Sequence, residues 1–203
     1  MQPHADAIRR LLEEVEMDPT LSQRALAFRL GVSLGSVNQL LRRLVRQRWL
    51  RRVPAAGRRV CHVISAEGTA ARDRLWREHA ESALALYGTV RDRVRRRLEA
   101  CATDPRRCNR AFLPSVALYG VGDVAQIAFA CAAELGVPLV GFVDDSPRES
   151  FLGLPVRAPG DLKSMALDGH AFDWLLVATL VNQDVIRARL EEVGFPLERV
   201  SWL

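Results

Sequence analysis

The chain has 203 residues and a net charge of +5, and 49% of its residues are hydrophobic. This length fits one large domain or two small ones. No apolar run approaches the roughly 18 residues of a membrane helix. The first residues, MQPHADAIRR, lack the apolar region of a signal peptide. We therefore expect a soluble, cytoplasmic protein with no membrane partner.

The four cysteines argue against a metal site and against a domain held together by disulfides. Cys61, Cys101, Cys108 and Cys131 contain no C-x-x-C pair, and Cys101 and Cys108 have only His62 and His79 as further candidate ligands. We expect reduced, mostly packed thiols, no metal site and no required cofactor.

Charge divides the chain into two parts. Residues 1–110 hold 23 arginines, no lysine and 12 acids, a net charge of +11. Residues 111–203 hold 5 arginines, 1 lysine and 12 acids, a net charge of −6. A basic front and an acidic back predict two domains with different partners, a polyanion being the natural partner of the first.

The front part reads as three helices and a hairpin. Apolar residues recur at helical spacing over 5–17, Ser22 caps a second helix that Gly31 closes, and Ser33 caps a third. WLRRV and RVCHVIS then flank the turn PAAGR, which predicts a β-hairpin. Residues 1–65 are therefore expected to form a winged helix-turn-helix, a DNA-binding domain.

The third helix has two different faces. Val37, Leu40, Leu41 and Leu44 share the side that should meet the core, and the opposite side runs from small and amide residues to arginines. Amides suit adenine, and arginines suit guanine or phosphate. The predicted contacts with double-stranded DNA are Ser33, Ser36, Asn38, Gln39, Arg42, Arg43 and Arg46 on this helix, and Arg51, Arg52, Arg58 and Arg59 on the hairpin. The alternative is a solvated arginine-rich face.

The same segment resembles a known family of regulators. DPTLSQRALAFRLGVSLGSVNQLLRRLVRQRWLRR is similar to MarR-like winged-helix regulators, in the form associated with exopolysaccharide loci. The resemblance covers about residues 8 to 75 and implies a DNA-binding regulator of transcription.

Residues 66–110 connect the two parts. The segment from Ala66 to Cys101 predicts one long helix with a broken apolar stripe and a possible break at Gly88, followed by a polar linker. Helices after a wing commonly form dimer interfaces, so we expect a homodimer. The alternative is a helix that packs onto its own domain.

Residues 111–203 alternate between strands and helices. Strands are expected at PSVALYG, PLVGFVDD, FDWLLVATL and LERVSWL, and helices at DVAQIAFACAAELG, APGDLKSMAL and NQDVIRARLEEVG. His170 is expected in a loop. Such repeats predict a small Rossmann-like parallel sheet covered by helices. The predicted fold class is therefore α/β with two domains, the second being this sheet.

A glycine turn marks the candidate ligand site. Gly120, Gly122 and Ala125 form G-x-G-x-x-A between strand and helix, where backbone N–H groups and the helix dipole favour a phosphate. Asp144 follows Gly122 by 22 residues, at a strand end where an acid can bind ribose. Asp144 and Asp145 argue against a 2′-phosphate, and Asp123 lies close to any pyrophosphate. The alternative is a tight turn with solvated acids.

This half also resembles the nucleotide-sugar-binding domain of the PglD-type acyltransferases. The resemblance rests on VALYGVGDVAQIAFACAAELGVPLVGFVDDSPRESFLGLPVRAPGDL and LLVATLVNQDVIRARLEEVGF, and the family's hexapeptide-repeat catalytic domain is missing. Asp123 and Val124 replace a histidine that is frequent in that family. The resemblance implies a nucleotide site at Gly120, Gly122, Asp123, Val124, Asp144, Asp145, Thr179 and Asn182.

A winged helix ahead of a Rossmann-like domain is also the architecture of the redox repressor Rex, which implies NAD(H) as an alternative ligand. No acid–base set, zinc spacing or G-x-S-x-G nucleophile motif is present in the back half, so we expect no enzyme. The sequence predicts a regulator that senses a nucleotide sugar such as a UDP-sugar. A nucleotide-sugar enzyme or a noncatalytic scaffold remains the alternative of another class.

Overall fold

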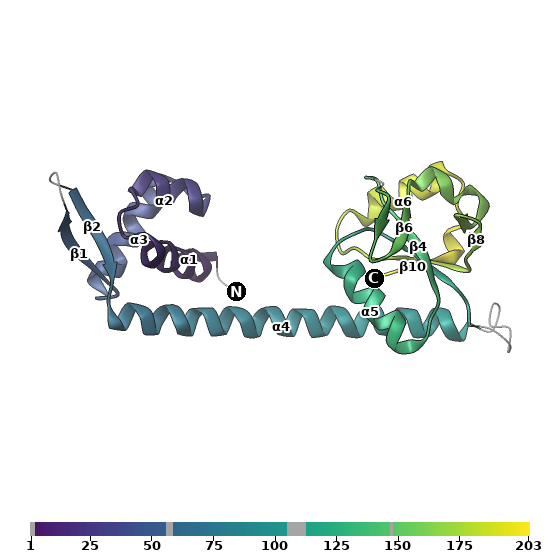
Figure 1. The fold of residues 1–203 in the computed structure, drawn as a ribbon, viewed down its shortest axis with the longest axis horizontal. Helices are drawn as coiled ribbons and strands as arrows, with labels where there is room; N and C mark the ends of the chain where they lie inside the picture. Colours follow the sequence, from purple (N-terminus) through teal and green to yellow (C-terminus); the bar gives the residue numbers. More distant parts are fainter. Residues whose placement is uncertain (1–2, 56–58, 105–112, 147) are drawn as a thin grey trace. The chain divides into compact units, whose positions relative to one another are not determined.

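A computed structural model describes residues 3–55, 59–104, 113–146 and 148–203 (Figure 1). The chain divides into two compact units, Met1–Ala85 and Leu86–Leu203, and the boundary falls inside helix α4 (Ala66–Thr103). Among the described residues, no helix has the length and apolar character needed to cross a membrane.

The first unit is a winged helix-turn-helix, as predicted. Its elements are the helices and strands α1 (Pro3–Met17), α2 (Gln23–Leu30), α3 (Leu34–Arg46), β1 (Leu50–Ala55) and β2 (Arg59–Ile64), followed by the start of α4 (Figure 1). The two strands pair antiparallel, with Leu50 opposite Ile64.

Local hydrogen bonds set the turn between α2 and α3. The Ser22 hydroxyl accepts the Ala25 N–H at 3.1 Å, and the Ser33 hydroxyl accepts the Ser36 N–H at 3.1 Å, so each helix begins at a serine cap. Gly31 ends α2 at φ 66°, a left-handed conformation that glycine adopts without steric cost. Both predicted caps and the predicted end of α2 are confirmed.

The core of this unit comes from all three helices. Its fully or nearly buried members are the apolar residues Ile8, Leu11, Leu12, Val15, Leu26, Ala27, Leu30, Val37, Leu40, Leu41, Leu44 and Leu50. They include the four residues expected on the inner side of α3.

The start of α4 is packed tightly against the end of the helix-turn-helix. The buried Ser65 hydroxyl donates to the Arg48 carbonyl at 2.6 Å and accepts the Gly68 N–H at 3.0 Å. A Cβ atom at Gly68 would lie 2.0 Å from the Trp49 carbonyl oxygen. Glycine is therefore needed here because backbone approaches backbone.

The second unit contains a six-stranded sheet of order β10-β9-β3-β4-β6-β5, in which all pairs are parallel except β5 with β6. Its strands are β3 (Val116–Tyr119), β4 (Leu139–Val143), β5 (Ser150–Phe151), β6 (Leu154–Arg157), β9 (Trp174–Val177) and β10 (Val200–Trp202). The helices of the unit include α5 (Asp123–Leu135) and α6 (Gln183–Glu192). The predicted parallel α/β sheet is thus confirmed.

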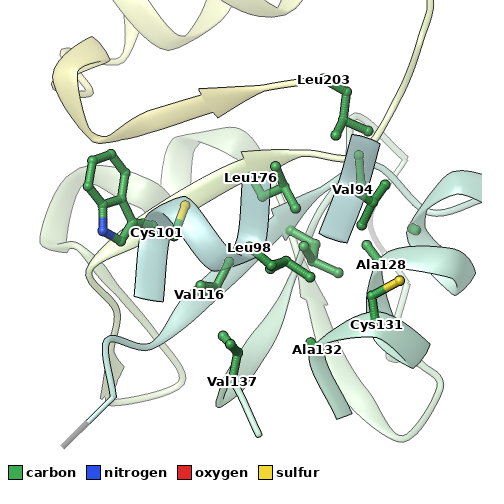
Figure 2. Packing of buried hydrophobic residues seen from close by; sticks show 14 of the residues in the cluster. Val94, Leu98, Cys101, Val116, Ala128, Cys131, Ala132, Val137, Leu176 and Leu203 are labelled. Carbon is green, nitrogen blue, oxygen red and sulfur yellow. The ribbon is translucent and has the colours of Figure 1, made fainter. Parts of the chain in front are cut away.

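Helix α4 supplies part of this unit's core. Val94 and Leu98 of α4 are fully buried and belong to one apolar cluster with Leu176 of the sheet and Ala128 of α5 (Figure 2). A second cluster, on residues such as Leu175 and Leu190, packs the sheet against α6. The sheet is covered on both faces, as buried parallel strands require.

Two local expectations were wrong and one possibility did not occur. α4 continues through Gly88, since one glycine costs a helix only about 1 kcal/mol. In place of a helix over APGDLKSMAL, a 3₁₀ turn η1 (Pro159–Ser164) ends at Met165, whose φ of 53° a helix cannot continue. His170 lies in β8 (His170–Ala171), which pairs with β7 (Ala166–Leu167), rather than in a loop. A short 3₁₀ turn η2 (Leu197–Arg199) precedes β10.

Candidate functional site

Helix α3 presents the face that the sequence predicts. Gln39, Arg42, Arg43 and Arg46 are exposed, together with Gly35 and Ser36, whereas Asn38 is half-buried. The Ser33 hydroxyl is exposed and lies 2.9 Å from that of Ser36. The face therefore begins with small polar groups at a capped helix start and continues into three guanidinium groups.

The ion pairs of the first unit leave this face positively charged. On the neighbouring helices, Arg29 pairs with Glu14 and Arg9 pairs with Glu13. Within the described residues, Arg42 and Arg46 form no such pair. Their charge is consequently open to an external anion.

The hairpin adds further cations. Arg51 and Arg52 of β1 are exposed, opposite Val63 and His62 of β2. Burial lowers the pKa of His62, and the charge of Arg52 lowers it further, which favours the neutral imidazole. Of the other predicted contacts, Arg58 lies outside the described residues, and Arg59 begins β2 with a side chain that is also outside them.

A cavity of about 440 Å³ lies at the carboxyl ends of the strands in the second unit. It is the place where open α/β sheets bind ligands. All eight predicted nucleotide residues line it, namely Gly120, Gly122, Asp123, Val124, Asp144, Asp145, Thr179 and Asn182. Residues from three loops, separated by up to 62 positions in the chain, thus come together.

The glycine turn lines the cavity. The Gly120 N–H donates to the Val143 carbonyl at 2.7 Å, and the φ of Gly120 is 107°, which favours glycine. Gly122 precedes α5 with extended backbone and gives it no side-chain cap. The first-turn N–H groups of α5 are therefore not satisfied by a cap at Gly122.

The two acids at the end of β4 have different partners. Asp144 accepts the Val121 N–H at 3.0 Å and the Ser146 N–H at 2.9 Å, so its carboxylate ties the glycine turn to the neighbouring strand end. Asp145 accepts the Tyr119 hydroxyl at 2.7 Å and forms an ion pair with Arg189 of α6. Burial, followed by the hydrogen bond to Asp145, raises the pKa of Tyr119 well above its usual range.

The loop after β9 also lines the cavity. The Gln183 side chain donates to the Thr179 carbonyl at 2.9 Å, and Asn182 adopts a left-handed φ of 57° before α6. Leu180, Val181 and Val185 line the cavity while remaining exposed, Val181 at 65%. One side of the cavity is thus apolar and accessible.

Sequence reasoning missed several of these residues. Tyr119 directly precedes the glycine turn, but its hydroxyl has a role only because Asp145 lies next to it. Arg189 sits within an ordinary charged helix, so no sequence signal distinguished it. The described residues contain no cluster of three or more His, Cys, Asp or Glu side chains arranged to hold a metal ion.

A protein-family comparison matches part of the first unit. The model described as "MarR family" matches residues 9–59, which span α2, α3, β1 and most of α1. Part of the N-terminal winged helix-turn-helix is therefore similar to the MarR family. No match was found among the curated proteins.

Solved structures of regulators are similar to part of the chain. MepR, a transcription regulator of the Staphylococcus aureus multidrug efflux pump MepA, is 21% identical with a TM-score of 0.36, over 41% of this chain and 64% of that one. MarR from E. coli is 25% identical with a TM-score of 0.32, over 34% and 53%. FabT from Streptococcus pneumoniae, in complex with DNA, is 22% identical with a TM-score of 0.33, over 39% and 57%. The chain thus spans less than two thirds of the length of each of these structures.

Proposed function

We propose that this protein is a transcriptional regulator that binds double-stranded DNA through α3 and the hairpin. The observation that carries the proposal is the exposed face of α3, where the arginines lie opposite a fully packed apolar side. The match of residues 9–59 to the MarR family supports it. The net charge of residues 1–110 supports it independently, because a polyanion is attracted to a basic domain whatever its sequence.

The salt dependence of DNA binding tests this proposal without knowledge of the operator sequence. Each arginine–phosphate contact contributes about one unit to the slope of log K against log salt. The double variant Arg42→Ala, Arg46→Ala should therefore bind a mixed-sequence duplex more weakly and lose about two units of slope. The matched control is Arg77→Ala, Arg96→Ala, which removes two exposed arginines from α4. Equal slopes in the two double variants would contradict the assignment of the face.

We further propose that the cavity of the second unit binds a small ligand containing a nucleoside. The glycine turn before an uncapped helix, the acids at the end of β4 and the apolar side at Leu180 and Val181 support this class. The ligand classes implied by the sequence resemblances are a nucleotide sugar and NAD(H). The ligand would alter DNA affinity by binding one conformation of a homodimer more tightly than another.

A thermal-shift panel of nucleosides, nucleotides, UDP-sugars, NAD and NADH tests the ligand proposal. A ligand present at 100 times its Kd should stabilise the second unit by about 2.7 kcal/mol. Gly120→Val should abolish the shift, because the left-handed φ of Gly120 excludes a β-branched residue. No shift with any compound would reject the ligand proposal and leave the DNA proposal intact.

A further inference from the structure

The charges around the cavity have one sign. Its lining includes three carboxylates, Asp123, Asp144 and Asp145, and no arginine, lysine or histidine among the described residues. The guanidinium of Arg189 already pairs with Asp145. A ligand that enters therefore meets an excess of negative charge.

Some backbone N–H groups of the glycine turn already donate hydrogen bonds within the protein. In the glycine turn, the Val121 N–H donates to Asp144 and the Gly120 N–H donates to the Val143 carbonyl. What remains is the start of α5, and Asp123 places a carboxylate in that first turn. The Asp123 carboxylate therefore already compensates the positive end of the α5 helix dipole, as an acid in the first turn of a helix does.

The polar and apolar parts of the cavity lining suit a ligand group other than a phosphate. Carboxylates only accept hydrogen bonds, so they select hydroxyl and amine donors rather than phosphate oxygens. The exposed apolar side chains of Leu180, Val181 and Val185 offer a surface to a flat ring. A sugar attached to a base has both features.

We infer that this cavity takes a nucleoside or nucleoside monophosphate and discriminates against ligands that carry a pyrophosphate. The inference rests on the proposed nucleoside-binding function and narrows it: ribose hydroxyls donate to the carboxylates at the end of β4, and the base lies against the apolar side. UDP-sugars and NAD(H) carry two linked phosphates, so they bind more weakly than their nucleosides.

Calorimetric titration of the full chain with uridine, UMP, UDP and UDP-glucose, and with adenosine, AMP, ADP and NAD, tests the inference. In each series we expect affinity to fall by about tenfold from nucleoside to diphosphate, as one unscreened charge repulsion predicts. High salt should narrow the difference because it screens the repulsion.

Asp123→Asn should raise the affinity for UDP and ADP by about tenfold relative to that for uridine and adenosine. The matched control is Asp184→Asn, which alters the first-turn aspartate of α6, a residue that does not line the cavity. Absence of binding in both series would reject the proposed ligand function itself. Affinity that rises with each added phosphate, and that Asp123→Asn does not improve, would leave that function standing and overturn the inference.

Discussion

Gly68 shows how one residue joins two elements of the first unit. Its missing side chain allows the first turn of α4 to contact the Trp49 carbonyl, where a Cβ atom would be only 2.0 Å from the oxygen. Ser65 holds the same junction through its hydroxyl. The position of α4 on the helix-turn-helix therefore depends on backbone contact that no larger residue permits.

Gly68→Ala should destabilise the first unit by roughly 3 kcal/mol, since a carbonyl cannot give way as a flexible side chain can. The control is Gly88→Ala in the same helix, where a Cβ atom meets nothing within 4 Å and alanine should stabilise by about 0.5–1 kcal/mol. Urea denaturation followed by circular dichroism measures both. A Gly68→Ala midpoint equal to that of the unmodified chain would contradict this packing.

Cys101 makes the stability of the second unit depend on pH. The thiol is buried in the core, and burial raises its pKa from 9.0 to about 11, against a smaller opposing effect of its hydrogen bond with Ser201. A pKa raised by folding gives a contribution that is fully present below the unfolded pKa and is lost as pH rises through the folded pKa. The affected window therefore runs from about pH 9 to pH 11.

Cys101→Ala should lower stability at neutral pH, because it leaves a small cavity, and should weaken the decline between pH 9 and pH 11. Tyr119, whose pKa is also raised, should preserve part of that decline. Urea denaturation midpoints measured across this pH range test whether stability declines as pH rises. An identical alkaline decline in both chains would show that Cys101 does not titrate in this way.

At the scale of elements, α4 carries one apolar stripe, which is buried along one part of the helix and exposed along another. Val90, Val94, Leu98 and Cys101 recur every three or four residues and are buried in the second unit. The same spacing continues backwards through Tyr87, Ala83, Ala80 and Trp76, of which Tyr87 and Trp76 are 48% and 55% exposed. Leu84, at 69% exposed, lies beside them. We propose that a second copy of the chain covers the exposed segment of this stripe, because the stripe continues the apolar surface that is buried in the core of the second unit.

Leu84→Glu with Tyr87→Glu should weaken dimerisation by tenfold or more, because it places charges in an apolar contact. Ser82→Glu is the control, since the exposed Ser82 lies about 160° from Leu84 and about 140° from Tyr87 around the helix. Sedimentation velocity over a dilution series measures the effect, with circular dichroism to verify helix content. A monomeric unmodified chain, or a double variant that dimerises as well as the control, would refute this interface.

At the scale of the whole molecule, α4 is one continuous helix that begins in the first unit and ends in the core of the second. Coupling between ligand and DNA requires that both affect the same element. By linkage, a ligand that changes DNA affinity by some factor must have its own affinity changed by DNA to the same degree.

Gly88→Pro interrupts α4 near the boundary of the two units, at a cost of about 3 kcal/mol to the helix. Each unit should still bind its own partner, while the effect of ligand on DNA affinity should shrink toward none. Gly88→Ala should preserve that effect. Fluorescence anisotropy with labelled duplex, with and without ligand, measures the coupling. Full coupling in Gly88→Pro would show that it does not pass through α4.

Much of the fold was predictable because its signals are local. Serine caps at Ser22 and Ser33, the glycine at Gly31 and the apolar spacing on α3 all act within a few residues, and the structure reproduces each. The 3₁₀ turn at Pro159–Ser164 was not predictable from its helical composition, because it ends at Met165 in a left-handed φ that this residue type does not signal.

The amino-acid sequence by itself determined the winged helix-turn-helix, the parallel sheet, the division of charge and the glycine turn, because periodicity, caps and composition report local preferences. Tertiary structure alone decided how Asp144, Asp145 and Arg189 are paired and which part of α4 stays exposed. Hydrogen bonds between residues dozens of positions apart depend on how strands and helices meet in space. For the same reason, the cavity's excess of carboxylates over available cations emerged only from the folded chain.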